Sequence, residues 1–321
     1  MRTSPRVLLV GAGAVGQVYA KYLQAAGCEV AFLVKEAHVA EARAGFTLHA
    51  FGPLSRTPRT TSLTGVEVLA SVADVRARSW DQVWLCVSSN ALRAGSWVRE
   101  LAGATGEATW VMLQPALEDR EWLLRQVPAE RLVSGVIPFL SFSAPLKAGD
   151  EPHAGTAFWF PPLSRGLLSG PPGRLEPLLR TLRAGGYRAA RHRDAARAVA
   201  VPSAVLTAFV AGLEAAGWRF SRLLQPEHLH RTHPAAREAA RIAAVHTGSS
   251  SAALLLLLRR GLFRLLPVAA RFVPFDLEAY LRVHFTKVRA QTQLMLEEYV
   301  ALGREAGLPV ANLEALLPPR S

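Results

Sequence analysis

A glycine-rich turn near the amino terminus constrains the fold of this chain more than any other feature. The apolar run Arg6–Val10 leads directly into GAGAVG, residues 11–16, and a helical pattern follows over residues 17–26. A second apolar run begins at Glu29. A strand, a glycine turn, a helix and a second strand within about 30 residues predict a βαβ unit with two parallel strands.

Each glycine in the turn has a physical reason to be there. One allows the tight turn after the strand, the next lets the backbone approach a pyrophosphate, and the last lets the helix pack closely on the strand. The start of the helix offers N–H groups and the positive end of its dipole to phosphates. We predict that a dinucleotide binds at Gly11, Gly13, Ala14, Val15 and Gly16. The alternative is a glycine turn that binds nothing.

The residue after the second strand indicates which dinucleotide binds. Enzymes that use NAD usually carry Asp or Glu there, to hold the ribose hydroxyls. This chain carries Lys35, followed by Glu36. A lysine attracts the 2′-phosphate of NADP, which a carboxylate would repel. We therefore predict NADP as the cofactor, with Lys35 at its 2′-phosphate. Alternatively, Glu36 holds the ribose and Lys35 is an ordinary surface residue.

Strands and helices alternate through the first part of the chain. Further strands are expected at residues 82–87, 109–113 and 132–137, with a helix at 118–125. This alternation predicts a doubly wound parallel sheet of the Rossmann type. Residues 136–191 are richer in proline and glycine. Here we expect a helix at 175–184 and strands that form an antiparallel edge of the first domain, at 138–142, 156–160 and 187–191.

The pattern is helical from Asp194 onward. The expected helices cover residues 195–220, 235–245, 250–263, 277–306 and 312–317. The sequence therefore predicts an α/β fold with two domains. Residues 1–193 form the dinucleotide-binding Rossmann domain, and residues 194–321 form an all-helical domain for substrate binding or dimerisation.

Three segments and the layout together resemble the ketopantoate reductases (2-dehydropantoate 2-reductases). The segments are GAGAVG, WLCVSSNAL at residues 84–92 and VMLQPAL at residues 111–117. The resemblance implies a Rossmann domain and a helical domain of the 6-phosphogluconate dehydrogenase C-terminal type. It also implies NADPH in the cleft and reduction of the keto group of ketopantoate. By position, it places Ser88, Ser89 and Gln114 beside the cofactor.

The chain departs from the family's pattern where the chemistry occurs. The family has a lysine where Ser89 stands. It also has an Asn-Gly pair after a polar residue, whereas here Gln114 is followed by Pro115 and Ala116. Its general acid is a lysine in the first helix of the second domain, with asparagines four and eight residues later. Two alignments of this chain, or registers, match the lysine and the two asparagines by position. One gives Arg197, Val201 and Val205, and the other gives Ala198, Pro202 and Leu206. Neither supplies a lysine or an asparagine.

Other side chains must therefore carry any proton transfer. The chain has only four lysines, and Lys287 is the only one in the predicted helical domain. His284, Lys287 and Gln291 are spaced by three and four residues, so one helix would place them on one stripe. The family's substrate-binding glutamate also falls near Gln291. We predict that Lys287 or His284 donates the proton and that Gln291 orients the substrate. The alternatives are a solvated helix face, or an acid among Ser203, Thr207 and residues 249–251.

The predicted function is hydride transfer between NADPH and a small keto or oxo acid other than ketopantoate, by an NADP-dependent oxidoreductase. An NADP-binding sensor or partner protein without turnover is the alternative. A third hypothesis is a ketopantoate reductase whose acid site has been rebuilt.

Composition limits the partners. The formal charge is +12, but the basic residues are scattered, and no nucleic-acid-binding motif is found. No metal site is expected, although Glu227, His230 and His233 are spaced by three residues between two prolines. No run of about 18 apolar residues lacks charge, so a spanning helix is not expected. We expect the leucine-rich residues 251–275 to pack within the domain or in a possible homodimer. Two cysteines in apolar runs and no signal-peptide pattern suggest the cytoplasm.

Overall fold

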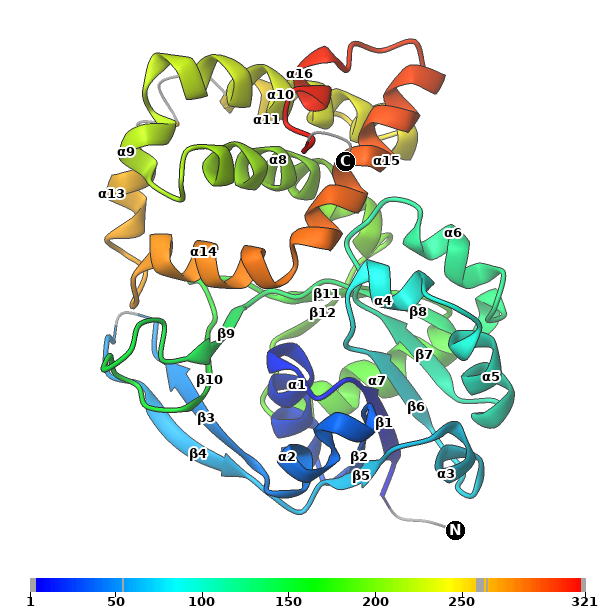
Figure 1. The fold of residues 1–321 in the computed structure, drawn as a ribbon. Coiled ribbons are helices and arrows are strands. Elements are labelled where there is room, and N and C mark those ends of the chain that lie inside the picture. Colours follow the sequence, from blue (N-terminus) through cyan, green and yellow to red (C-terminus); the bar gives the residue numbers. More distant parts are fainter. Residues whose placement is uncertain (1–3, 54, 258–262, 264, 319–321) are drawn as a thin grey trace. The chain divides into compact units, whose positions relative to one another are not determined.

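The chain divides into two compact units, each described here by itself. A computed structural model describes residues 4–53, 55–257, 263 and 265–318. The first unit comprises Met1–Gln114 and Asp119–Ala196, and the second comprises Pro115–Glu118 and Arg197–Ser321 (Figure 1). The predicted boundary, between residues 193 and 194, lies three residues before this division. The sequence did not indicate that Pro115–Glu118, hereafter the crossing segment, belongs with the helical unit.

An eight-stranded sheet forms the centre of the first unit. Its order is β12-β11-β8-β7-β6-β1-β2-β5. All neighbouring strands are parallel except β8 and β11. The predicted doubly wound sheet is therefore confirmed. The strands are β1 (Arg6–Val10), β2 (Glu29–Leu33), β5 (Glu67–Leu69), β6 (Gln82–Leu85), β7 (Thr109–Met112), β8 (Leu132–Gly135), β11 (Gly166–Ser169) and β12 (Ala189–Arg191).

Both faces of this sheet are buried, which explains why its strands are continuous apolar runs. Successive side chains of a strand point to opposite faces. Val7 and Leu9 belong to a core that includes residues of α1 (Ala14–Ala25) and α7 (Pro172–Ala184). Leu8 and Val10 belong to a second core with residues of α3 (Val72–Arg76) and α5 (Trp97–Ala104). Short helices complete the unit: α2 (Val39–Arg43), α4 (Ser89–Arg93) and α6 (Asp119–Leu124), with 3-10 turns η1 (Glu36–His38) and η2 (Ala129–Arg131).

A separate four-stranded sheet accounts for the region rich in proline and glycine. It contains β3 (Phe46–Phe51), β4 (Arg59–Leu63), β9 (Leu140–Ala144) and β10 (Gly155–Trp159), in the order β4-β3-β10-β9. The strands predicted at 138–142 and 156–160 do pair antiparallel, as β9 and β10, but they belong to this separate sheet because β10 also pairs with β3. Gly155 permits this pairing, since a Cβ there would lie 2.6 Å from the carbonyl oxygen of Thr47.

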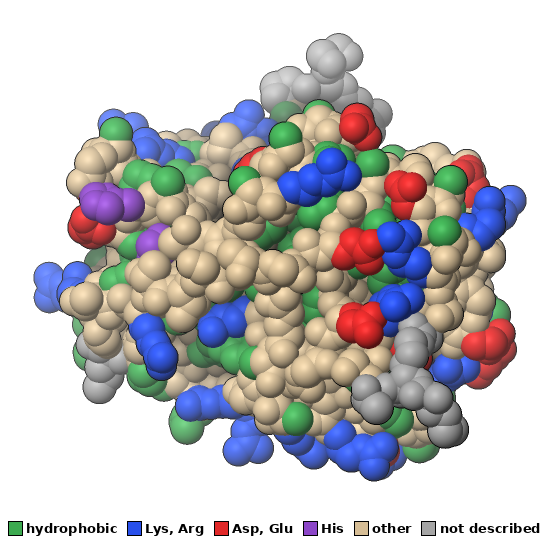
Figure 2. All heavy atoms as spheres, turned by 90° about the horizontal axis from the view of Figure 1, so that it is seen from below, with side chains coloured by type: hydrophobic (Ala, Val, Ile, Leu, Met, Phe, Trp, Pro, Cys, Tyr) green, Lys and Arg blue, Asp and Glu red, His purple; other side chains and the backbone are tan. Residues whose placement is uncertain are grey.

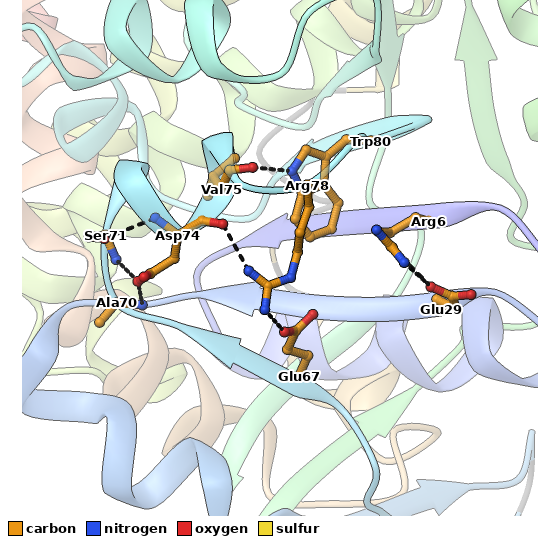
Figure 3. Close-up of polar contacts among 9 residues, drawn as sticks. All are labelled: Arg6, Glu29, Glu67, Ala70, Ser71, Asp74, Val75, Arg78 and Trp80. Atoms are coloured by element: carbon orange, nitrogen blue, oxygen red, sulfur yellow. Dashed lines mark hydrogen bonds and ion pairs between the residues drawn. The ribbon is translucent and has the colours of Figure 1, made fainter.

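One ion pair joins the amino ends of β1 and β2, and another ties the amino end of β5 to the loop after α3 (Figure 3). Arg6 of β1 donates from Nε to Glu29 of β2 at 2.9 Å, and Arg78 pairs with Glu67 of β5. Arg78 also donates to the carbonyl oxygen of Asp74 at 2.9 Å. A pocket at this edge is lined by Arg6, Glu29, Glu67 and neighbouring residues. Ligands of open α/β sheets bind at the opposite end of the strands, beyond their carboxyl ends.

Helices make up the second unit, as predicted. They are α8 (Ala195–Ala215), α9 (Phe220–Leu223), α10 (Pro226–Thr247), α11 (Ala252–Leu257), α13 (Leu266–Ala270), α14 (Leu277–Lys287), α15 (Arg289–Glu305) and α16 (Ala311–Glu314). Alanines of α8 and α10 dominate its core. Helices α8 and α10 pack closely at Gly212 of α8. A Cβ there would lie 2.1 Å from Oγ1 of Thr232 of α10, so only glycine allows this approach. Part of the predicted helix 250–263 lies outside the described residues.

Two helix predictions need correction. The predicted helix 277–306 is two helices that run in different directions, because Val288 leaves the helical conformation (φ −107°, ψ 24°) (Figure 1). Helix α10 begins at Pro226 instead of residue 235. Proline at a first helical position needs no N–H partner, and Pro234 is accommodated inside the helix.

One helix of the described chain, α8, is long and apolar enough to cross a membrane by length and composition. Of its apolar window, 56% is buried inside the structure. A core helix meets the same criteria, so this finding is weak evidence for a membrane. The basic residues are spread over the face seen in Figure 2, and several lie beside Asp or Glu.

The crossing segment is held within the second unit by a buried carboxylate. Glu298 of α15 is only 6% exposed and accepts hydrogen bonds from the backbone N–H groups of Leu117, at 2.8 Å, and Glu118, at 3.3 Å. A buried donor that loses its acceptor costs about 1–3 kcal/mol. Glu298 therefore fixes the backbone of this segment.

We expect Glu298→Ala to lower the free energy of unfolding by about 2–4 kcal/mol, because it leaves two N–H groups without this acceptor and opens a cavity. Urea unfolding followed by circular dichroism would measure the change. Glu297→Ala is the matched control, since Glu297 is exposed and bonds only with Gln293 one turn away in the contacts described. Equal losses for the two variants would contradict the role given to Glu298.

Candidate cofactor and active site

The strand order reverses between β1 and β6. From β1 the chain proceeds outward to β2 and β5, and from β6 it proceeds in the other direction to β7 and β8. Ligands of doubly wound sheets bind at the carboxyl ends of the strands at such a switch point. Gly11 follows β1 there, and Cys86, Val87 and Ser88 follow β6. The sheet topology thus brings together two loops that are 75 residues apart in the sequence.

The glycine turn has the geometry that the sequence predicted. Gly11 has φ +97°, and a Cβ there would lie 3.0 Å from the carbonyl oxygen of Cys86. A Cβ at Gly16 would lie 2.3 Å from the carbonyl oxygen of Gly11, so only glycine allows α1 this close to the turn. Gly13 differs from both, because it is exposed and a Cβ there would meet nothing within 4 Å. Open space therefore lies beside Gly13, where a pyrophosphate would fit.

Helix α1 begins at this open space without a side-chain cap. Gly13 is its N-cap, and the first turn, which contains Ala14, Val15 and Gly16, carries no acidic residue. The first N–H groups of a helix have no preceding helical carbonyl to bond, and they carry the positive end of the dipole. Gln17 braces the turn by donating from Nε2 to the carbonyl oxygen of Ala12 at 2.8 Å. The residues present therefore fit the phosphates of a dinucleotide.

Lys35 and Glu36 lie just beyond the carboxyl end of β2, and both side chains are exposed. Lys35 is the N-cap of η1, and its side chain makes no capping hydrogen bond. Both residues lie at the same end of the sheet as Gly11, because β1 and β2 are parallel and Val10 is paired with Leu33. The role predicted for Lys35 remains a prediction, as does the alternative in which Glu36 holds the ribose.

The structure shows what the side chain of Ser89 contacts. Its side chain is fully buried, and its hydroxyl donates to Oδ2 of Asp119 at 2.6 Å. Ser88, by contrast, is the N-cap of α4 and accepts from the N–H of Ala91 at 3.3 Å. The Ser89 hydroxyl therefore faces Asp119 and holds the loop after β6, and the predicted place of Ser89 beside the cofactor stays a prediction.

Gln114 also acts on the backbone. It is 8% exposed, and its Nε2 donates to the carbonyl oxygens of Leu85, at 2.9 Å, and Val87, at 2.7 Å. Its Oε1 accepts from the N–H of Leu113 at 3.1 Å. Both amide hydrogens are used, so Gln114 ties the carboxyl ends of β6 and β7 together. Its predicted place beside the cofactor stays a prediction.

The half-buried thiol of Cys86 lies beside the glycine turn. Burial raises the pKa of Cys86 well above its usual value, so the thiol stays protonated at neutral pH.

The break at Val288 separates the predicted catalytic residues. His284 and Lys287 lie one turn apart on α14, whereas Gln291 lies on α15. The prediction of one continuous stripe was therefore wrong. Lys287 is exposed, and His284 stacks on the ring of Tyr280 with centroids 5.3 Å apart. No proline or glycine stands between residues 284 and 291 to reveal this break in the sequence. The catalytic roles themselves remain predictions.

The two registers left open for α8 lie on different faces of the helix. Val201 and Val205 belong to the core of the second unit or pack against it, and Arg197 bonds to Gly248 and Ser249 at the end of α10. The other register is exposed at all three positions, Ala198, Pro202 and Leu206. Arg197 of the first register is exposed as well, whereas the second register is exposed throughout and entirely apolar.

Several of the remaining polar candidates have structural partners. Thr207 donates to the carbonyl oxygen of Ser203 at 2.9 Å, and Ser249 accepts from Thr247 at 2.9 Å. Glu227, His230 and His233 lie on α10, and the ring of His233 packs against Phe263. Among the described residues, no three His, Cys, Asp or Glu side chains are arranged to hold a metal ion.

We expect Gly13→Asp to abolish dinucleotide binding while the protein still folds. The open space at Gly13 accommodates the new side chain, but its carboxylate would repel a pyrophosphate. Binding can be followed by titrating NADPH and NADH and recording nicotinamide fluorescence. Gly13→Ala is the matched control, because it adds only a methyl group. Unchanged affinity in a folded Gly13→Asp protein would refute the cofactor site.

Comparison with known proteins agrees with this geometry. Residues 7–148 match a family model described as ketopantoate reductase PanE/ApbA. No curated protein sequence matches the chain.

Solved structures extend the likeness in fold to nearly the whole chain. A 2-dehydropantoate 2-reductase from Geobacter metallireducens GS-15 has 19% identity and a TM-score of 0.68, with 97% of each chain covered. A PanE/ApbA family ketopantoate reductase from Ralstonia eutropha JMP134 has 17% identity and a TM-score of 0.73, covering 97% of this chain and 95% of its own. A D-mandelate dehydrogenase with NADH and anilino(oxo)acetate has 12% identity, a TM-score of 0.73 and the same coverage. The resemblance to the ketopantoate reductase family is therefore confirmed, in sequence for residues 7–148 and in fold along nearly the whole chain.

Proposed function

We propose that this protein is an NADP-dependent oxidoreductase that transfers hydride between NADPH and a small keto or oxo acid other than ketopantoate. The observation that carries the proposal is the glycine turn at the switch point, with open space at Gly13 and an uncapped α1 behind it. The family match and the dehydrogenases of the same fold support a nicotinamide-dependent oxidoreductase. When bound, the nicotinamide would supply the hydride.

The chain itself must supply a proton for the alkoxide that forms, and a positioned acid contributes roughly 10²–10⁴-fold to such a step. The exposed face of α8 cannot do this, because Ala198, Pro202 and Leu206 carry no ionisable group. Arg197 bonds to a backbone carbonyl, and a guanidinium does not release its proton near neutral pH. Lys287 and His284 of α14 remain the proposed donors, and Gln291 is proposed to orient the substrate.

The same apolar face of α8 favours a second candidate function. A protein that binds NADP as a sensor or as a partner subunit needs the glycine turn and Lys35 but no proton donor. Turnover of any keto acid with NADPH would exclude this candidate, whereas binding without turnover would support it.

We propose further that the protein functions in the cytoplasm as a homodimer, without nucleic acid or membrane partners. Cys28 and Cys86 are free thiols, the state expected in a reducing compartment. Several large apolar side chains of the second unit are exposed, which favours a contact between subunits: Val245, Leu256, Leu265, Val268 and Phe272.

Lys35→Ala should weaken NADPH binding about ten-fold or more and leave NADH binding nearly unchanged, because a charge-assisted contact with the 2′-phosphate is lost. Dissociation constants for both cofactors, measured by fluorescence titration, would show this. Glu36→Gln serves as the companion variant, since it should weaken NADH binding instead if Glu36 holds the ribose. Equal losses for both cofactors in Lys35→Ala would show that Lys35 does not bind the 2′-phosphate.

When a panel of 2-keto acids is tested with NADPH, we expect the protein to reduce some of them and to oxidise NADPH. Ketopantoate should be turned over poorly. With the best substrate, Lys287→Met or His284→Phe should lower kcat by roughly 10²–10⁴ and leave NADPH affinity intact. Lys147→Met is the matched control, because Lys147 lies in a loop of the first unit. Wild-type kcat in both variants would rule out these two residues as the donor, and rapid turnover of ketopantoate would refute the substrate assignment.

A further inference from the structure

A buried charge network lies directly behind the loop that follows β6. Asp119, the first residue of α6, is fully buried. Its Oδ2 accepts from the hydroxyl of Ser89 at 2.6 Å, and its Oδ1 accepts from Nε of Arg93 at 2.8 Å. A buried carboxylate is costly unless it is both paired with a cation and hydrogen-bonded, and Asp119 is both. The proposed chemistry does not use this network.

The partners of Asp119 belong to a single helical face. Ser89 and Arg93 are four residues apart on α4, so their side chains point the same way. Ser88 is the N-cap of α4 and the last residue of the loop that borders the switch point. Asp119 therefore anchors the first turn of α4 to the start of α6 and limits the movement of the loop.

A second side chain acts on the same loop. Gln114 bonds to the carbonyl oxygens of Leu85 and Val87, at the start and the middle of the connection from β6 to α4. Gln114 and Asp119 lie immediately before and after the crossing segment. The side chains of Gln114 and Asp119 thus both hold the loop that follows the carboxyl end of β6.

We propose that Asp119 is a positioning residue that holds residues 86–88 in the shape required by the nicotinamide half of the dinucleotide. This inference rests on the proposed function. A dinucleotide-binding sheet consists of two mononucleotide-binding halves. The half formed by β1 and β2, with the glycine turn and Lys35, takes the adenosine end. The half that begins with β6 takes the nicotinamide end, and Asp119 acts only on that half.

The test compares a whole cofactor with its adenosine half. Asp119→Asn keeps the shape of the side chain but removes its charge and its best acceptor. Calorimetric titration should show NADPH binding weakened about ten-fold or more, while binding of 2′,5′-ADP, which lacks the nicotinamide half, changes less than about two-fold. Asp74→Asn is the matched control, because Asp74 caps α3 in the same unit, and it should change neither affinity.

Ser89 variants keep the proposal testable if Asp119→Asn fails to fold. Ser89→Ala removes one hydrogen bond and leaves the pair of Arg93 and Asp119 in place, so it should weaken NADPH binding selectively but less. Ser89→Thr keeps the hydroxyl and should restore the affinity. Near-equal weakening of NADPH and 2′,5′-ADP, or no weakening in the folded variants, would overturn the role of Asp119. Absence of NADPH binding in the wild-type protein would instead refute the proposed function itself.

Discussion

The close contact between α1 and the turn after β1 determines the geometry of the first unit. A single methyl group at Gly16 would collide with the carbonyl oxygen of Gly11, 2.3 Å away. The far side of α1 is equally close to its neighbour, because a Cβ at Gly185, after α7, would lie 1.9 Å from the carbonyl oxygen of Tyr22. Helix α1 is thus fixed at both ends, and its amino terminus is directed at the switch point of the sheet.

An aromatic cluster packs between α1 and the rest of the first unit. The hydroxyls of Tyr19 and Tyr187 share a hydrogen bond of 2.9 Å, and Tyr22 packs edge-on against Tyr187 and Phe160. Burial raises the pKa of both Tyr19 and Tyr187, so both hydroxyls stay protonated and neutral. A rigid, uncharged support of this kind leaves the dipole of α1 as a prominent electrostatic feature at the glycine turn.

Buried carboxylates organise the chain where it passes between the units. Within the first unit, Asp119 holds α4, and within the second unit, Glu298 holds the backbone of Leu117 and Glu118. Nothing in the local sequence distinguishes these two acids from the many exposed ones. Burial and partners identify them, and both depend on residues far away in the chain: Ser89 is 30 positions from Asp119, and Leu117 is 181 from Glu298.

The sequence by itself determined the βαβ unit, the doubly wound sheet, the helical second half and the glycine turn, because each rests on local spacing of apolar residues and glycines. Only the tertiary structure decided that β10 pairs with β3, that the side chains of Ser89 and Gln114 bond to protein groups, and that α8 exposes Ala198, Pro202 and Leu206. Strand partners and burial arise from contacts between distant segments, which local patterns do not encode. The same reason applies to the break at Val288, where the torsion angles change without a proline or glycine in the sequence.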